Sequence, residues 1–141
     1  MRTMRVVVAS AVLAVVVLGG LQAMAGGDGG SFSARLSGYE EIPTLSVPGT
    51  GRFSAELDGG ALHFTLRYRG LTGPAHQAHI HLGRPWVAGG VIAFLCGGGG
   101  QDPCPAGTSG TVRGTIRAGA TYVNVHTEAF PTGEIRGQIR H

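Results

Sequence analysis

The sequence predicts an all-β domain, an antiparallel Greek-key β-sandwich or barrel of about eight strands. The first observation is that apolar and polar residues alternate with a period of two through most of the chain after residue 30, which is typical of strands with one buried face. The second is that turn signals rich in glycine and proline separate these stretches. The third is that no convincing helical periodicity follows residue 30. Many short strands with regular turns indicate a sandwich or barrel.

The alternation places each strand in turn. Asp58-Gly59-Gly60 predicts a hairpin between the second and third strands. The segment 38–49 holds no tight turn, so we expect it to cross between two sheets. The apolar run 91–95 lacks a polar face, so we expect it in the middle of the fold. The expected strands are 31–37, 51–57, 62–69, 75–82, 91–95, 111–116, 122–126 and 134–139.

The N-terminal segment has the order of a secretory signal. Arg2 and Arg5 precede an apolar run over 6–18, and Ala23-Met24-Ala25 forms a small-x-small cleavage site. An uncleaved anchor needs roughly 20 apolar residues, and this run stops at Gly19. We expect a signal peptide over 1–25, a flexible leader over 26–30 and a β domain over 31–141. The protein would be secreted or held in the periplasm or cell envelope, with no membrane span after cleavage.

Cysteine content and charge narrow the function classes. Cys96 and Cys104 are the two cysteines, and in an exported protein a disulfide is expected; the alternative is a pair of metal thiolates. Loss of Arg2 and Arg5 with the signal leaves nine arginines against eight acidic residues, a net charge of +1. No basic stripe for nucleic acid is evident along the chain.

A histidine pattern is the strongest functional signal. In His79-Ile80-His81 the two histidines share one strand face, about 6.5–7 Å apart. His126 lies on the polar face of another expected strand. If the two strands are neighbours, the three imidazoles can meet, and three histidines suit Zn²⁺ or Cu²⁺. We therefore expect a copper or zinc site, which rings more than about 8 Å apart would exclude.

Polar residues on matching faces are candidates to orient these rings. They are Gln77, Asn124, Glu134, Arg136 and Gln138. The structural alternative is that the histidines only hydrogen-bond across strands, and that Glu134 and Arg136 form a surface ion pair of small energetic value.

No other catalytic pattern stands out. The serines lack a nucleophile-elbow context, and no phosphate-binding loop of the Gly-x-x-x-x-Gly-Lys type is present. Glu40 and Glu41 are adjacent, so on a strand they would point to opposite faces and make a poor carboxylate pair. His63 and His141 receive no functional role, and for His76 a position at the strand end is favoured over a role as a ligand. The sequence therefore favours a binding protein over an enzyme.

Several spaced blocks resemble the CHRD (chordin-type) domain family. They are 36–43 (LSGYEEIP), 70–73 (GLTG), 78–83 (AHIHLG), 118–127 (AGATYVNVHT) and 133–139 (GEIRGQI). The resemblance covers nearly all of 31–141 and identifies a single-domain, exported, bacterial-type member. It implies an extracytoplasmic β domain and supplies no reaction.

The site alone is similar to that of copper-zinc superoxide dismutase, another Greek-key β-sandwich. The similarity implies that His79, His81 and His126 would hold copper and that Arg136 would guide an anion. The bridging histidine and the zinc ligands of that family are absent from the sequence, so a full dismutase is not expected. Three hypotheses follow: a copper- or zinc-binding domain, a metal-free module for a protein or glycan partner, and, last, a dismutase-like enzyme.

Overall fold

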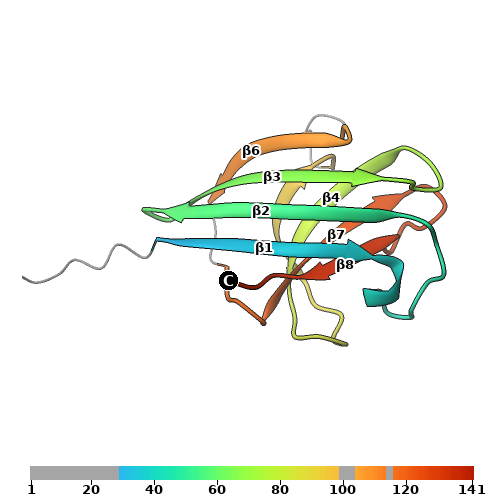
Figure 1. The fold of residues 1–141 in the computed structure, drawn as a ribbon, viewed down its shortest axis with the longest axis horizontal. Helices are drawn as coiled ribbons and strands as arrows, with labels where there is room; N and C mark the ends of the chain where they lie inside the picture. The colour runs from blue at the N-terminus through green and yellow to red at the C-terminus, as the bar shows by residue number, and fades with distance from the viewer. Residues whose placement is uncertain (1–28, 99–103, 114–115) are drawn as a thin grey trace, which may run out of the picture.

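A computed structural model describes residues 29–98, 104–113 and 116–141 (Figure 1). The expected signal peptide, 1–25, lies outside these ranges. The elements are β1 (Gly30–Ser37), the 3-10 turn η1 (Gly38–Glu40), β2 (Thr50–Asp58), β3 (Ala61–Arg69), β4 (Ala75–Leu82), β5 (Val91–Cys96), β6 (Gly107–Arg113), β7 (Thr121–Thr127) and β8 (Ile135–Gln138). Among the described residues, no helix is long and apolar enough to cross a membrane.

The eight strands form one antiparallel sheet in the order β5-β4-β7-β8-β1-β2-β3-β6. It folds into two facing layers, β5-β4-β7-β8 behind and β1-β2-β3-β6 in front (Figure 1). The layers join where β8 meets β1, through the pairs Ser37–Arg136 and Ser33–Arg140. The end strands β5 and β6 approach each other, so the sheet is nearly closed. The predicted all-β antiparallel fold is confirmed.

The core confirms the two-residue alternation. Side chains of both layers fill the space between them and are almost completely buried, which removes apolar surface from water. They include Phe53, Leu66, Ile80, Val123 and Ile135.

A disulfide joins Cys96, at the end of β5, to Cys104, just before β6. The expected disulfide is confirmed, and with both sulfurs bonded to each other the thiolate alternative is excluded. The bond links the two end strands of the sheet, which are not paired by a hydrogen-bonded ladder in the part of the chain that the structure describes.

Two placements from the sequence are wrong. The segment 38–49 does not cross between sheets, because β1 and β2 are direct neighbours paired from Gly30–Leu57 to Ser37–Thr50. Strand β5 is not central: it ends the strand order, and Val91, Ile92 and Phe94 are 42–43 % exposed. An apolar run shows that a strand lacks a polar face, but an edge strand can also expose apolar side chains.

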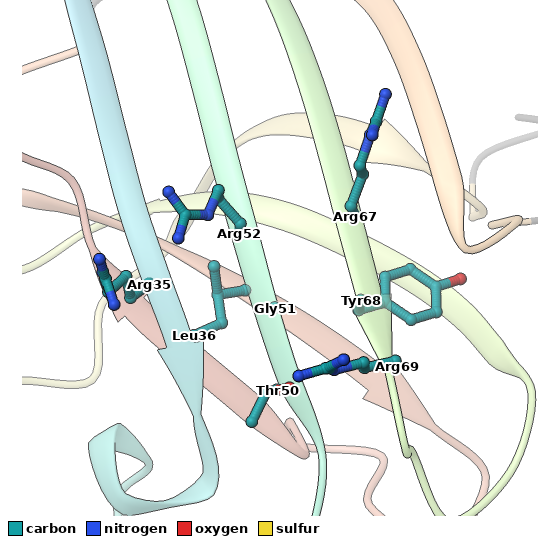
Figure 2. A pocket seen from close by; sticks show the side chains of 8 residues that line it. All are labelled: Arg35, Leu36, Thr50, Gly51, Arg52, Arg67, Tyr68 and Arg69. Atoms are coloured by element: carbon teal, nitrogen blue, oxygen red, sulfur yellow. The ribbon is translucent and has the colours of Figure 1, made fainter.

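Strand β6 begins at Gly107, four residues before the expected start, and residues 114–115 of the expected strand lie outside the described ranges. On the outer face of the front layer, arginines of three adjacent strands form a row (Figure 2): Arg35, Arg52 and Arg67 are direct partners in the register.

Candidate metal centre

Strand pairing brings the three histidines together. β4 and β7 are neighbours, with His79 opposite Asn124 and Gln77 opposite His126. His126 therefore lies diagonally across from His79 on the same face. This is the outer face of the back layer, since the alternate residues, such as Ile80 and Val125, point into the core.

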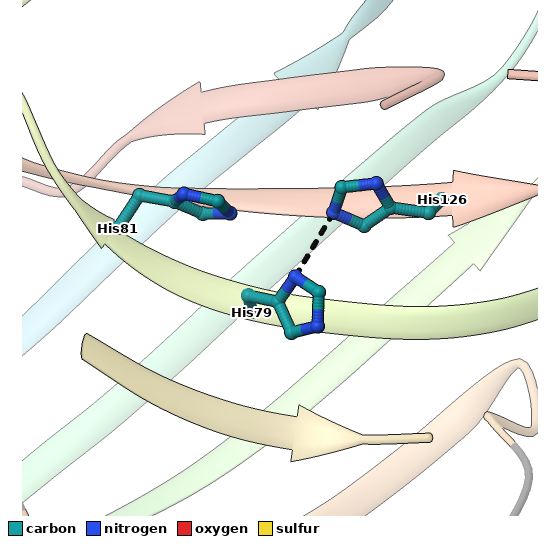
Figure 3. A group of neighbouring side chains, drawn as sticks. All are labelled: His79, His81 and His126. Carbon is teal, nitrogen blue, oxygen red and sulfur yellow. Dashed lines mark hydrogen bonds between the residues drawn. The ribbon is translucent and has the colours of Figure 1, made fainter. Parts of the chain in front are cut away.

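The imidazoles lie close enough to share one ion (Figure 3). One nitrogen of each of His79, His81 and His126 lies within 4.8 Å of the others. The ring centroids are 4.7 Å apart for His79 and His126, 5.5 Å for His79 and His81, and 6.2 Å for His81 and His126. All three distances are below the roughly 8 Å that would exclude a common metal.

Backbone carbonyls orient two of the rings. His81 Nδ1 lies 2.9 Å from the Gly89 oxygen, and His126 Nδ1 lies 3.0 Å from the Pro131 oxygen. A carbonyl oxygen can only accept, so each Nδ1 carries the proton and donates it. Nε2 of each ring is therefore the unprotonated nitrogen. A histidine that donates one ring N–H to a carbonyl and offers the other nitrogen is typical of metal sites.

The third ring completes the set. His79 Nδ1 lies 3.1 Å from His126 Nε2. Because His126 Nε2 is an acceptor, His79 Nδ1 donates this bond. The buried atoms Nε2 of His79 and Nε2 of His81 then have no hydrogen-bond partner among the described residues. Buried polar atoms are almost always paired, so the unpaired Nε2 of His81, beside the His79–His126 contact, indicates a place for a ligand.

Burial keeps the cluster neutral. The pKa of His79 falls from 6.5 to about 4, chiefly because burial penalises the charged ring and then because of the neighbouring His126, His81 and His76. Burial also lowers the pKa of His81 and of His126. Neutral imidazole is the form that binds a metal, so all three rings are in the binding form at neutral pH.

Asn124 and Glu41 form a buried pair beside the histidines. Asn124 Nδ2 donates to Glu41 Oε1 over 2.7 Å. Burial raises the pKa of the Glu41 carboxyl from 4.5 to about 7, against the opposing effects of the Arg136 charge, a backbone hydrogen bond and the Asn124 bond. In the strand register Asn124 lies opposite His79, but its amide nitrogen donates to Glu41.

Arg136 is 3 % exposed and reaches the cluster indirectly. Its Nη2 donates to the carbonyl oxygens of Arg84 and Val87 over 3.2 and 3.0 Å. Its guanidinium carbon lies 3.5 Å from the centroid of the Tyr122 ring, which stacks on His81 at 4.8 Å. Arg136 therefore holds the loop 83–90, which supplies the Gly89 carbonyl, over the site.

Glu134 and Gln138 bond elsewhere. Glu134 accepts from the Thr72 backbone N–H, the Thr72 hydroxyl and the Thr127 hydroxyl over 2.7–2.8 Å. Thr127 alternates with His126 along β7, so this carboxylate lies on the core side. Gln138 donates to the carbonyls of Gly83 and Thr121.

The remaining histidines are not members of the converging group, although His76 lies near enough to lower the pKa of His79 and of His126. His63 bonds to Thr111 on the front layer, and His141 packs on Phe32. His76 is exposed on β4.

Several neighbours of the histidine cluster could not be identified from the sequence. The carbonyls of Gly89 and Pro131 come from loops, as does Glu41, and no local pattern marks them. Phe94 lies edge-on to His79, with ring centroids 4.6 Å apart. Tyr122 could have been found, because it shares its strand face with Asn124 and His126.

Comparison with known proteins supports the family resemblance. The family model described as CHRD domain matches residues 32–139, a range that contains the whole histidine cluster. No curated protein and no solved structure matches the chain significantly, so the similarity to copper-zinc superoxide dismutase has no support from these comparisons.

Proposed function

This chain belongs to the CHRD domain family, and we propose that it binds one copper or zinc ion through His79, His81 and His126. The family and the disulfide are typical of extracellular proteins, so the coarse assignment is an extracellular-type binding module. The metal site is the specific function that we propose for it.

One observation carries this proposal. Two of the three rings are held by Nδ1–H bonds to carbonyl oxygens, and their Nε2 atoms lie in the same buried cluster as both nitrogens of His79. Cross-strand hydrogen bonding by itself would not explain why Nε2 of His81 lacks a partner in the described structure. A shared ion would bind Nε2 of His81, Nε2 of His126 and Nδ1 of His79, the nitrogen that faces His126.

The distances fit a metal with modest adjustment. Two nitrogens bound to one tetrahedral zinc at 2.0–2.1 Å are about 3.3 Å apart, close to the 3.1 Å between His79 Nδ1 and His126 Nε2. On binding through Nδ1, the proton of His79 would move to Nε2, so the ring would remain neutral. The His81 ring is farther from the other two rings, and a shift of about 1–2 Å would bring its Nε2 within bonding distance of the same ion. A bound ion would supply Lewis acidity or, for copper, electron transfer; we propose no reaction.

The test is a metal measurement on matched variants. The protein, purified without chelator, is analysed for metal content; the metal-free protein is then titrated with Zn²⁺ and with Cu²⁺. The double variant His79→Ala/His81→Ala removes two proposed ligands. The control His63→Ala/His141→Ala removes two exposed imidazoles outside the cluster.

We expect about one ion per chain in the parent and the control, with loss in the ligand variant. Metal should also raise the melting temperature of the parent, because the ion binds only the folded state. Circular dichroism checks that the variants fold. Absence of binding even with excess ion, or equal binding by the ligand variant, would overturn the proposal and favour a metal-free module for a protein or glycan partner. Copper-dependent superoxide removal would separately be required for a dismutase.

A further inference from the structure

A second feature lies on the opposite layer, far from the histidines in the fold. Arg35 on β1, Arg52 on β2 and Arg67 on β3 are direct cross-strand partners. Arg69 joins them from the next row, which holds Ser37 and Thr50. All four arginines are exposed, and Figure 2 shows them together on one face of the strands.

The row is electrostatically unfavourable by itself. Neighbouring strands are about 4.8 Å apart, and like charges placed directly opposite destabilise a sheet. The flanking row of Ser33, Ser54 and Thr65 carries no acidic residue. On the same face of β2 the first acid, Glu56, is four residues from Arg52, about 13 Å along the strand. Four of the nine arginines after residue 25 are therefore gathered without a counter-charge in the neighbouring rows of the described strands, although the net charge after residue 25 is +1.

The arginines border a depression that runs across three strands. Arg35, Arg52 and Arg67 form one side, and Thr50 and Arg69 form the other. Its floor consists of the residues between these rows, and their side chains do not obstruct it: Leu36 is buried, Gly51 has no side chain, and the Tyr68 hydroxyl bonds to the Cys104 carbonyl. The floor is therefore mostly backbone, open to an extended ligand.

The side chains around the depression restrict the class of ligand that it can bind. Guanidinium groups bind carboxylate and sulfate oxygens in paired hydrogen bonds, and a row of three suits a chain with repeated anionic groups. The outward residues of the depression include no aromatic side chain for stacking nucleic-acid bases. They also include no large apolar side chain to insert into a membrane.

We propose that this depression binds a linear anionic polysaccharide bearing carboxylate or sulfate groups. The polymer lies across β1, β2 and β3, and its charges meet Arg35, Arg52 and Arg67. An exported domain encounters such polymers at cell surfaces. The site is independent of the histidine cluster, which lies on the other layer.

The experiment measures binding of the folded protein to heparin, as the sulfated probe, and to alginate, as the carboxylated probe. The triple variant Arg35→Gln/Arg52→Gln/Arg67→Gln removes the row. The control Arg84→Gln/Arg113→Gln/Arg117→Gln removes the same charge from exposed positions elsewhere. A second variant, Thr50→Asp, places a negative charge in the depression and leaves every arginine present.

We expect the parent and the control to bind at least one probe, with affinity falling as salt rises. The row variant and Thr50→Asp should each lose tenfold or more, and His79→Ala/His81→Ala should lose nothing. Equal losses in the row variant and the control would show that net charge alone acts, and would overturn the proposal. Binding only to phosphatidylglycerol vesicles or only to single-stranded DNA would overturn it as well.

Discussion

The outer faces of the two layers differ in a way that the alternation of residues does not show. On the back layer, polar side chains of β4, β7 and β8 are buried under loops; Arg136 is 3 % exposed. On the front layer, polar side chains of β1, β2 and β3 are open to solvent, as Arg52 is. The same period of two thus produces a covered polar layer in one place and a solvated one in the other. The difference shows that the covering loops, and not the strands themselves, decide whether the outward face of a layer is exposed to solvent.

Covering changes what a polar residue can do. A buried donor or acceptor without a partner costs about 1–3 kcal/mol, so the back layer binds most of its polar atoms to loop carbonyls and places neutral imidazoles beside one another. The front layer meets water, so charges can remain without partners and be available to a ligand. The comparison can be tested at three pairs of positions.

The largest effect is expected where the two layers join. A Cβ at Gly137 on β8 would overlap the Arg35 carbonyl oxygen on β1 and lie 2.8 Å from its carbon. Backbone cannot yield as a side-chain tip can, so Gly137→Ala should lower the free energy of unfolding by about 3 kcal/mol. Urea denaturation measures this. The control Gly107→Ala on β6 meets nothing within 4 Å and should change stability by about 0.5 kcal/mol or less. Equal effects would show that β8 and β1 are less tightly joined than described.

An intermediate effect is expected from the buried arginine. Arg136→Met removes two hydrogen bonds to carbonyls and the contact with Tyr122, and we expect a loss of about 2 kcal/mol. Arg52→Met on the exposed face should change stability by less than about 0.5 kcal/mol, since it also relieves repulsion from Arg35 and Arg67. Chemical denaturation of both variants compares the layers directly. If Arg52→Met lowered the free energy of unfolding as much as Arg136→Met, the contrast between the exposed front face and the covered back face would be contradicted.

The third effect is expected from Glu41 and depends on pH. Its pKa is raised from 4.5 to about 7 in the fold, so the folded state holds the proton that the unfolded chain releases between these values. Stability from this group is therefore present below pH 4.5 and lost as the pH rises toward 7. Glu41→Gln cannot titrate, so its melting temperature relative to the parent should rise across this window and level off above it. A difference that stays constant with pH, as expected for Ser54→Ala on the exposed face, would argue against the burial of Glu41.

The sequence-based predictions were right where they depended only on neighbouring residues in the chain, and wrong where they depended on tertiary contacts. The alternation placed most strands, the hairpin at Asp58-Gly59-Gly60 and the shared face of His79 and His81, because these depend only on neighbours in the chain. The apolar run 91–95 was assigned to the centre because composition does not distinguish an edge strand from a buried one. Glu134 was expected on the histidine face, but it lies before β8 begins and points to the core side, toward Thr127.

The sequence by itself determined the all-β fold and which histidines share a face, because a strand alternates its side chains between two sides; it favoured a disulfide between the two nearby cysteines, which the structure shows. Only the tertiary structure decided that β4 lies beside β7, which brings His126 to His79. It also decided that Gly89 and Pro131 orient the rings, and that three arginines widely separated in the chain form one row. Strand order and loop paths join residues far apart in sequence, and the free energy that selects them comes from packing the whole core.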